Sequence, residues 1–258
     1  MSFFRILILI ASLFIGLFRC DLLIKKGMNC IVLFDYSASL SDEEFNKYVE
    51  MFRQGLLKQL TFDDHIIIIP IDKASEMKDE VIADCNFSDF KEQLSRNIGP
   101  FEMLNEADTL NARFMRALDT MFSHEIYYFR DQRKKFNLET DIIGALIQAE
   151  KYLKESNNAI FIFSDMIQES PEVNFKKLNT SSEVEEKIKN LKDTAQMPNL
   201  KKSSIFVCGA TEKNKQDYRL NKYFWEEFFK ESKGYLKDYG YGNANRIASF
   251  INNIKAKQ

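Results

Sequence analysis

The sequence is poor in cysteine, proline, glycine and histidine: its 258 residues include 4 Cys, 4 Pro, 9 Gly and 2 His. So few glycines and prolines exclude a collagenous or low-complexity chain. Four scattered cysteines, none at the short spacing of a zinc site, exclude a scaffold built on disulfides. We interpret Cys30 and Cys208, which lie in apolar runs, as small hydrophobic residues of the core.

An excess of charge of one sign is also missing. The 36 basic and 38 acidic side chains nearly cancel to a net charge of -2. The chain therefore lacks the strong positive field that holds the phosphate backbone of a nucleic acid, and we expect no nucleic-acid partner. Bulky apolar residues are plentiful, with 23 Phe and 10 Tyr, which predicts one folded domain with a well-buried core.

Residues 1–20 have the pattern of a secretory signal or a membrane anchor. An uninterrupted apolar run over 6–18 follows Arg5, and it is shorter than the roughly 20 residues that a spanning helix needs. The run ends in a sequence that resembles a bacterial lipobox, whose Cys20 would be acylated, although Arg19 stands where a small residue is expected. A lipoprotein signal, an uncleaved anchor and a simple buried helix are the three alternatives. The first two predict an exported protein tethered to a membrane.

The rest of the chain alternates between apolar runs typical of buried parallel strands and segments with helical spacing. The predicted strands cover 28–34, 65–71, 159–163, 204–208 and, more weakly, 235–239. The first predicted helix follows a capping box at Ser41 and Glu44. Further helices are predicted over 141–155, 183–192, 215–232 and 243–255. Residues 73–138 break the alternation, and we interpret them as a mainly helical insertion with a helix over 105–130.

This alternation predicts an α/β fold over residues 28–255. We expect a Rossmann-like, doubly wound, mostly parallel sheet with helices on both faces. In such sheets ligands bind beyond the carboxyl ends of the strands, where the loops into the helices converge. The functional site is therefore expected at that edge.

Oxygen-bearing side chains follow two of the predicted strands at that edge. Asp35, Ser37 and Ser39 come directly after the first strand, and Asp165 follows the strand that ends at residue 163. Thr140 stands at the start of the helix between them. Two carboxylates and three hydroxyls are ligands suited to a hard divalent cation, so we predict a site for Mg2+ or Mn2+.

These three segments, D-x-S-x-S, T-D-x-x-x-A-L and S-D, resemble in order and spacing the metal-ion-dependent adhesion site of the von Willebrand factor A domain family. The likeness extends over roughly residues 28–255, is specific at the three loops and is architectural elsewhere. Ala38 and Met166 stand where the family commonly has glycine.

The resemblance implies that the metal keeps one position open for an Asp or Glu carboxylate of a protein partner. A cation held largely by neutral hydroxyls and water keeps much of its attraction for such an acid. Tyr36, residues 167–171 and parts of the insertion are then expected to form the rim that selects the partner.

Other functions remain as alternatives. Asp35 and Asp165, together with Asp141, would suit a metal-dependent phosphatase or nuclease. A third hypothesis is a scaffold protein in which the metal site is vestigial. A nucleophilic Ser37 is disfavoured because the two histidines, His65 and His124, lie in no triad-like surroundings. The plain structural alternative is that the serines cap the next helix and the aspartates are turn acids.

Two further patterns are interpreted as structural. The aromatic residues at 223, 224, 225, 228 and 229 are flanked by charges at helical spacing, and we expect them to pack in the core. The lysines at 176, 177, 187, 189, 192, 201 and 202 alternate with acids and are expected on solvated faces, with no function assigned.

Overall fold

The structure of the protein is a computed structural model, and it describes residues 27–37, 40–73, 80–89, 100–133, 139–210 and 215–256. Residues 1–20, including Cys20, lie outside the described residues. The choice between a lipoprotein signal, an uncleaved anchor and a buried helix therefore stays a prediction. Ser39 of the candidate site and its neighbour Ala38 also lie outside the described residues. Within the described ranges no helix combines the length and the apolar character needed to cross a membrane.

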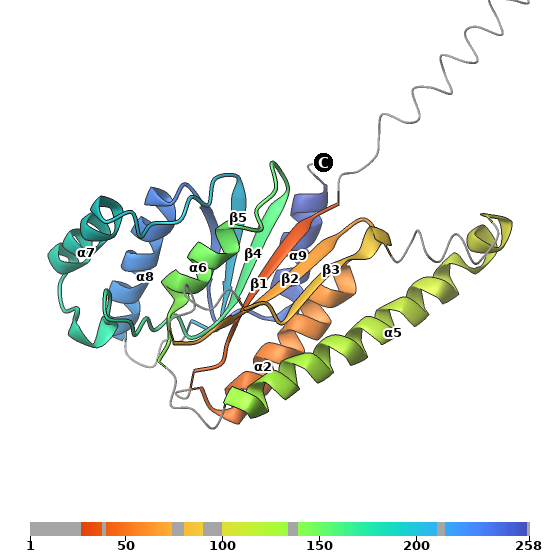
Figure 1. The fold of residues 1–258 in the computed structure, drawn as a ribbon, viewed down its shortest axis with the longest axis horizontal. Helices are drawn as coiled ribbons and strands as arrows, with labels where there is room; N and C mark the ends of the chain where they lie inside the picture. The colour runs from red at the N-terminus through yellow and green to blue at the C-terminus, as the bar shows by residue number, and fades with distance from the viewer. Residues whose placement is uncertain are drawn as a thin grey trace, which may run out of the picture.

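The centre of the protein is a six-stranded sheet with the order β3-β2-β1-β4-β5-β6 (Figure 1). Its strands are β1 (Asn29–Asp35), β2 (His65–Ile71), β3 (Ala83–Asn86), β4 (Asn158–Phe163), β5 (Ser203–Cys208) and β6 (Tyr235–Gly240). All neighbouring pairs are parallel except β2 and β3. The prediction of an α/β fold with a mostly parallel sheet is thus confirmed, and the strand order is that of the Rossmann fold.

Helices cover both faces of the sheet, as expected for a doubly wound fold (Figure 1). One face carries α2 (Asp42–Met51) with its continuations η2 (Phe52–Leu56) and η3 (Leu57–Gln59), α5 (Pro100–Arg133) and α9 (Ala244–Lys255). The other face carries α6 (Ile142–Glu150), η4 (Phe175–Lys177), α7 (Ser181–Asp193) and α8 (Lys215–Glu231).

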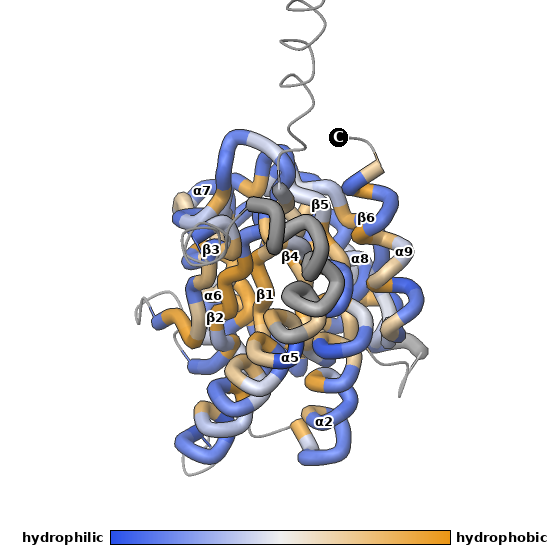
Figure 2. The backbone as a smooth tube through the Cα atoms, turned by 90° about the vertical axis from the view of Figure 1, so that its right-hand side faces the viewer, coloured by the Kyte–Doolittle hydropathy of each residue, from blue (hydrophilic) through white to orange (hydrophobic). Residues whose placement is uncertain are grey.

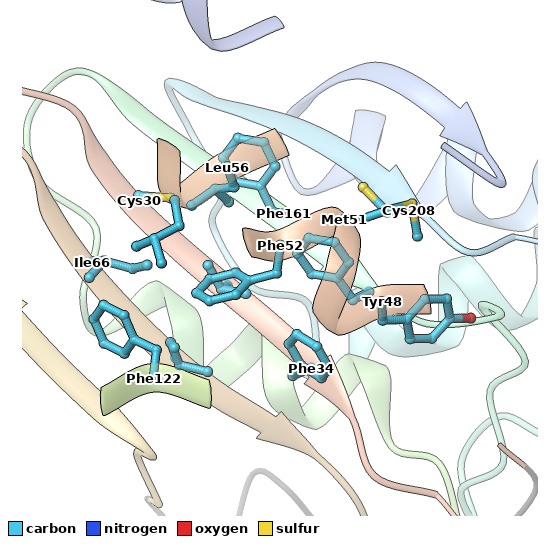
Figure 3. Packing of buried hydrophobic residues seen from close by; sticks show 14 of the residues in the cluster. Cys30, Phe34, Tyr48, Met51, Phe52, Leu56, Ile66, Phe122, Phe161 and Cys208 are labelled. Carbon is cyan, nitrogen blue, oxygen red and sulfur yellow. The ribbon is translucent and has the colours of Figure 1, made fainter. Parts of the chain in front are cut away.

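The side-chain alternation of β1 divides the core into two layers. Cys30, Val32 and Phe34 point toward α2, α5 and α9, whereas Ile31 and Leu33 point toward α6 and the helices beside it. Figure 3 shows the first layer, in which Phe34 lies among aromatic rings from η2 and β4. In Figure 2 the strands β1 and β2 form an apolar centre within a largely polar outer layer of helices. A strand buried on both faces explains why its sequence is continuously apolar.

Local signals fix the starts of several helices where the sequence placed them. Ser41 accepts a hydrogen bond from the Glu44 backbone N–H, and the Glu44 carboxylate accepts one from the Ser41 N–H, so the predicted capping box of α2 is confirmed. Asn243 caps α9 in a similar way. Helix α6 ends at Glu150, five residues earlier than predicted, because residues 151–157 turn back into β4.

The insertion joins the main fold more closely than the sequence suggested. It supplies β3, a short edge strand that the sequence analysis did not predict, because four residues are too few to show a period. The predicted helix over 105–130 is confirmed as part of the longer α5. Leu118, Phe122 and Ile126 of α5 are buried in the same layer as α2 and β1.

The predicted core roles of the cysteines and the aromatic cluster are confirmed. Cys30 and Cys208 are fully buried, and burial raises the pKa of both thiols well above its ordinary value. In the aromatic cluster, Phe224, Trp225, Phe228 and Phe229 are fully buried against the sheet. The exception is Tyr223, whose hydroxyl reaches out to donate a hydrogen bond to Glu185.

The packing of α5 generates a stability prediction. Phe122 is fully buried and its ring contacts Phe52 edge-on, so Phe122→Ala leaves a cavity between α5 and the sheet. We expect the free energy of unfolding to fall by about 3 kcal/mol. Tyr128 on the same helix is 56% exposed, so Tyr128→Ala should change it by less than about 0.5 kcal/mol. Chemical denaturation of both variants measures the difference, and equal effects would show that α5 is not part of the core.

Candidate metal centre

The candidate residues lie where the order of the sheet reverses. Strand β1 is followed in sequence by β2 on one side, while β4 pairs with β1 on the other side. In doubly wound sheets this switch point opens a crevice at the carboxyl ends of the two central strands. Asp35 is the last residue of β1, and Ser164 and Asp165 follow directly on β4. The topology therefore delivers two of the three predicted loops to one place.

Asp35 is fully buried, and hydroxyl and backbone groups hold its carboxylate. Its Oδ1 accepts a hydrogen bond from the Ser37 N–H at 2.8 Å, and its Oδ2 accepts one from the Ser164 hydroxyl at 2.7 Å. The Ser37 hydroxyl also hydrogen bonds to it. Burial raises the pKa of Asp35 above its ordinary value, although these hydrogen bonds and the charge of Arg130 act in the opposite direction.

Asp35 differs from the other two most deeply buried aspartates. The carboxylate of Asp72, at the end of β2, lies 3.2 Å from a guanidinium nitrogen of Arg133. The carboxylate of Asp64, at the opposite edge of the sheet, lies 2.6 Å from the Lys255 ammonium. Among the described residues, no Lys, Arg or His forms such an ion pair with Asp35. A buried carboxylate without a cation is costly to ionise, and a bound metal ion would supply the missing charge.

The segment after β4 connects the end of β1 to the start of α6. The Ser164 hydroxyl, besides donating to Asp35, accepts a hydrogen bond from the Met166 N–H at 3.0 Å. Asp165 is half-buried, and its Oδ1 accepts a hydrogen bond from the Ile167 N–H. The Glu169 N–H donates to the carbonyl of Thr140 at 2.8 Å. The loop that carries Asp165 is thus fixed against both of the other predicted loops.

Asp35 and Asp165 also act on a common neighbour. Tyr48 of α2 is almost fully buried, and burial raises the pKa of its phenol, with the charges of Asp35 and then Asp165 raising it further. In Figure 3 the Tyr48 oxygen points away from the aromatic cluster. Both carboxylates therefore lie near the Tyr48 hydroxyl of α2, the helix that follows the Asp35 loop.

Residue Met166 adopts a backbone conformation that usually favours glycine. Its φ is 65°, in the left-handed region, and its side chain is nevertheless fully buried in the layer with α6 and α8. The Trp225 indole N–H donates to the Met166 carbonyl at 2.9 Å, which helps to hold this strained turn. The left-handed turn after β4 is therefore made by a residue that is not glycine and whose side chain is anchored in the core.

Thr140 and Asp141 occupy the start of α6. Thr140 is buried, and the Asp141 carboxylate caps the helix by accepting a hydrogen bond from the Gly144 N–H at 3.0 Å. Gln168, which is fully buried, donates to the same carboxylate oxygen and accepts from the Ile142 N–H. Because Asp141 is used in this way, it is poorly placed to act as a third catalytic acid.

Two expectations about the rim are corrected by burial. Tyr36 is only 1% exposed and packs between Phe34, Phe45 and Phe129, so it is a core residue and cannot contact a partner. Within residues 167–171, Gln168 is equally inaccessible. Neither role could be predicted from the sequence, because both residues are polar enough to be expected at a surface.

The loop after β1 is held from behind by helix α5. The Arg130 side chain is buried and donates hydrogen bonds to the carbonyls of Ser37, at 3.2 Å, and of Leu40. Its guanidinium carbon lies 4.8 Å from the centre of the Phe45 ring. The role of Arg130 could not be predicted from the sequence, since nothing in a long charged helix indicates which arginine turns inward.

The histidines do not complete a nucleophilic site. His65 lies at the opposite edge of the sheet, where its ring nitrogens contact Asn29 and Asp84 at 2.9 and 2.6 Å. His124 is exposed on α5. A nucleophilic Ser37 therefore has no imidazole base. In the ranges that the structure describes, no group of three or more His, Cys, Asp or Glu side chains is arranged to hold a metal.

The donor set nevertheless fits a hard divalent cation in kind. Asp35, Ser37 and Thr140 are buried oxygen donors, and Asp165 lies on a loop fixed against them. Metal binding by these residues and by Ser39 stays a prediction. The sequence matches no family model, and no curated protein resembles it.

A close backbone approach at this edge generates a second prediction. Gly209 follows β5 with φ 124°, and a Cβ there would lie 2.4 Å from the Tyr48 hydroxyl and 2.5 Å from the Ser164 carbonyl. We expect Gly209→Ala to reduce the free energy of unfolding by about 3 kcal/mol. The matched control is Gly240→Ala, which meets no atom within 4 Å and should cost about 1 kcal/mol or less. Thermal unfolding compares them, and equal losses would contradict the crowding at Gly209.

The burial of Asp35 without an ion-pair partner among the described residues generates a third prediction. Because its pKa is raised in the folded state, its contribution to stability is present at acidic pH and lost as the pH rises through the folded pKa. In the presence of a chelator at neutral pH, Asp35→Asn should therefore unfold at the same or a higher temperature than the parent. Added Mn2+ should stabilise the parent, by about 3 kcal/mol at a hundredfold excess over its dissociation constant, and leave the variant unchanged.

Differential scanning calorimetry with Mn2+ and with chelator tests this expectation. Asp193→Asn, at an exposed acid on α7, is the control and should keep the response to Mn2+. A large loss of stability in Asp35→Asn without metal would mean that the carboxylate serves the fold instead.

Proposed function

We propose that this protein binds Mg2+ or Mn2+ at the switch point of its sheet and uses the ion to hold an acidic residue of a protein partner. Asp35, Ser37, Ser39, Thr140 and Asp165 are the proposed ligands. One observation carries the proposal: Asp35 is fully buried at the ligand-binding edge of the sheet and has hydroxyl and backbone donors but no ion-pair partner among the described residues.

The charge of the donor set favours binding over hydrolysis. Two carboxylates and several neutral hydroxyls leave a divalent ion free to attract one further acid. A metal-dependent hydrolase needs additional acids or cations around the reacting phosphate. Here Asp141 caps α6, Arg133 pairs with Asp72, and Arg130 binds backbone carbonyls. These groups are occupied in holding the edge together.

We also propose that the protein is exported and attached to a membrane through its first 20 residues. The support is the apolar run over 6–18 and Cys20 at its end, as in a lipoprotein signal or an uncleaved anchor. The first described residue, Gly27, lies at the amino-terminal edge of the sheet, because β1 begins two residues later. The proposed metal site is at the opposite edge, so tethering would leave it facing away from the membrane.

A capture experiment tests the proposed binding role. Full-length protein is immobilised and exposed to membrane and envelope extracts with Mg2+ or with chelator, beside Asp35→Ala. We expect partners to be retained only by the parent in Mg2+. Mn2+ affinity, measured by calorimetric titration, should fall more than about a hundredfold in Asp35→Ala, since loss of even an indirect metal contact costs ten- to a hundredfold.

The control for this experiment is Asp193→Asn, which should bind Mn2+ and partners like the parent. Retention of the same partners in chelator would falsify the metal-mediated contact. Phosphatase and nuclease assays with added Mn2+ examine the hydrolase alternative, and activity lost in Asp35→Ala would replace the adhesion role.

A further inference from the structure

Three turns at the amino-terminal edge of the sheet carry a group of lysines. Strands β1, β4, β5 and β6 are parallel, and their registers place Asn29 beside Asn158, Asn158 beside Ser203, and Ser204 beside Tyr235. The turns that lead into β4, β5 and β6 therefore lie along one edge. They contain Lys151, Lys154, Lys201, Lys202 and Lys233, with Glu155 as their only acid.

These lysines face outward and stand beside the point where the chain enters the fold. Lys154, Lys201, Lys202 and Lys233 are exposed, and none forms an ion pair with another described residue. Lys154 is fixed there, since its N–H donates to the Asn158 side chain, which also accepts from the Asn29 amide. The apolar segment that precedes residue 27 thus leads to this basic edge.

Two of the lysines occupy strained backbone positions. Lys202 has a φ of 64° and Lys233 a φ of 62°, in the left-handed region that favours glycine and asparagine. Asn157, which directly precedes β4 as Lys202 directly precedes β5, has the same conformation with a φ of 61°. Asparagine tolerates this conformation better than lysine, so it would suit all three turns. A local rule broken in this way is expected where a side chain serves binding.

An exposed aromatic ring and a groove continue the basic edge. Tyr235 is 57% exposed and lies between Lys233 and Lys237, whose ammonium is 5.2 Å from the centre of the ring. Lys202 and Lys237 line a groove of about 930 Å³ between α9 and the strands β5 and β6. Its walls also carry Asn and Ser side chains and the ion pair of Arg246 with Asp238, so the two lysines give it a net positive charge. Tyrosine and lysine together are typical of surfaces that rest in the headgroup region of a membrane.

We propose that this edge, defined as Lys154, Lys201, Lys202, Lys233, Tyr235 and Lys237, docks on the surface of a membrane rich in anionic phospholipids. The lysines attract the phosphate headgroups, Tyr235 enters the interface, and the groove receives headgroups along α9. The inference rests on the proposed membrane attachment and is independent of the metal site. A single lipid chain gives only weak, reversible attachment, and a basic surface beside it supplies the second signal.

The strained lysines allow a test that separates binding from folding. Full-length protein carrying Lys202→Asn and Lys233→Asn is floated with phosphatidylcholine vesicles and with vesicles containing about one third phosphatidylglycerol. We expect the ratio of anionic to neutral binding to fall by about fivefold for each lysine removed. The unfolding temperature should stay the same or rise. High salt should reduce the ratio of the parent in the same way.

Two controls accompany this variant. Lys202→Arg with Lys233→Arg keeps the charges and should keep the ratio. Lys73→Asn with Lys177→Asn removes two exposed lysines at the carboxyl-terminal edge and should leave the ratio unchanged. Tyr235→Ser should weaken binding to both kinds of vesicle.

Some outcomes would overturn the proposal. An unchanged ratio in the asparagine variant would do so, as would an equal fall in the control at the other edge. A lower unfolding temperature with an unchanged ratio would assign the lysines to the fold. Binding to neutral vesicles does not depend on the charge of the lysines. Loss of this binding would therefore show that attachment through the first 20 residues fails, whereas loss of the preference for anionic vesicles alone would concern the basic edge.

Discussion

The pairing of β1 with both β2 and β4 is the constraint on which the rest of the structure depends. Because β1 is parallel to both neighbours and buried on both faces, its last residue is fixed in depth and direction. Asp35 is that residue. The chain continues to one side through β2 and returns to the other at β4, so β1 ends where the strand order reverses, which is the place where ligands bind in folds of this class. The position of Asp35 at the end of this strand therefore buries its carboxylate, and the neighbouring loops supply the hydroxyls around it.

Much of the fold could be predicted from the sequence because its signals are strong and local. The strands of the sheet interior are continuous β-branched or aromatic runs, and the starts of α2 and α9 carry side-chain caps. The edge strand β3 could not be predicted, since it is short, half-exposed and stabilised by pairing with β2. The early end of α6 is likewise a tertiary effect.

The candidate site was predictable in its location and less so in its details. Asp35 and the pair Ser164 and Asp165 stand where apolar strands end, and such strand ends are easily recognised in a sequence. The burial of Tyr36 and the cap made by Gln168 depend on contacts between residues far apart in the chain. The same is true of Arg130, which reaches the loop after β1 from a helix more than 90 residues later. Periodicity cannot reveal such contacts, because they depend on how elements meet.

The hydrogen bonds from Arg130 to the loop after β1 affect which substitutions this loop can tolerate. The guanidinium holds main-chain oxygens of residues 37 and 40, and every amino acid provides those. Substitutions of side chains in the loop therefore leave these backbone contacts in place, as long as α5 keeps Arg130. Such an arrangement separates the backbone shape of this loop from the chemistry of its side chains, so single substitutions there could change that chemistry while the shape is kept.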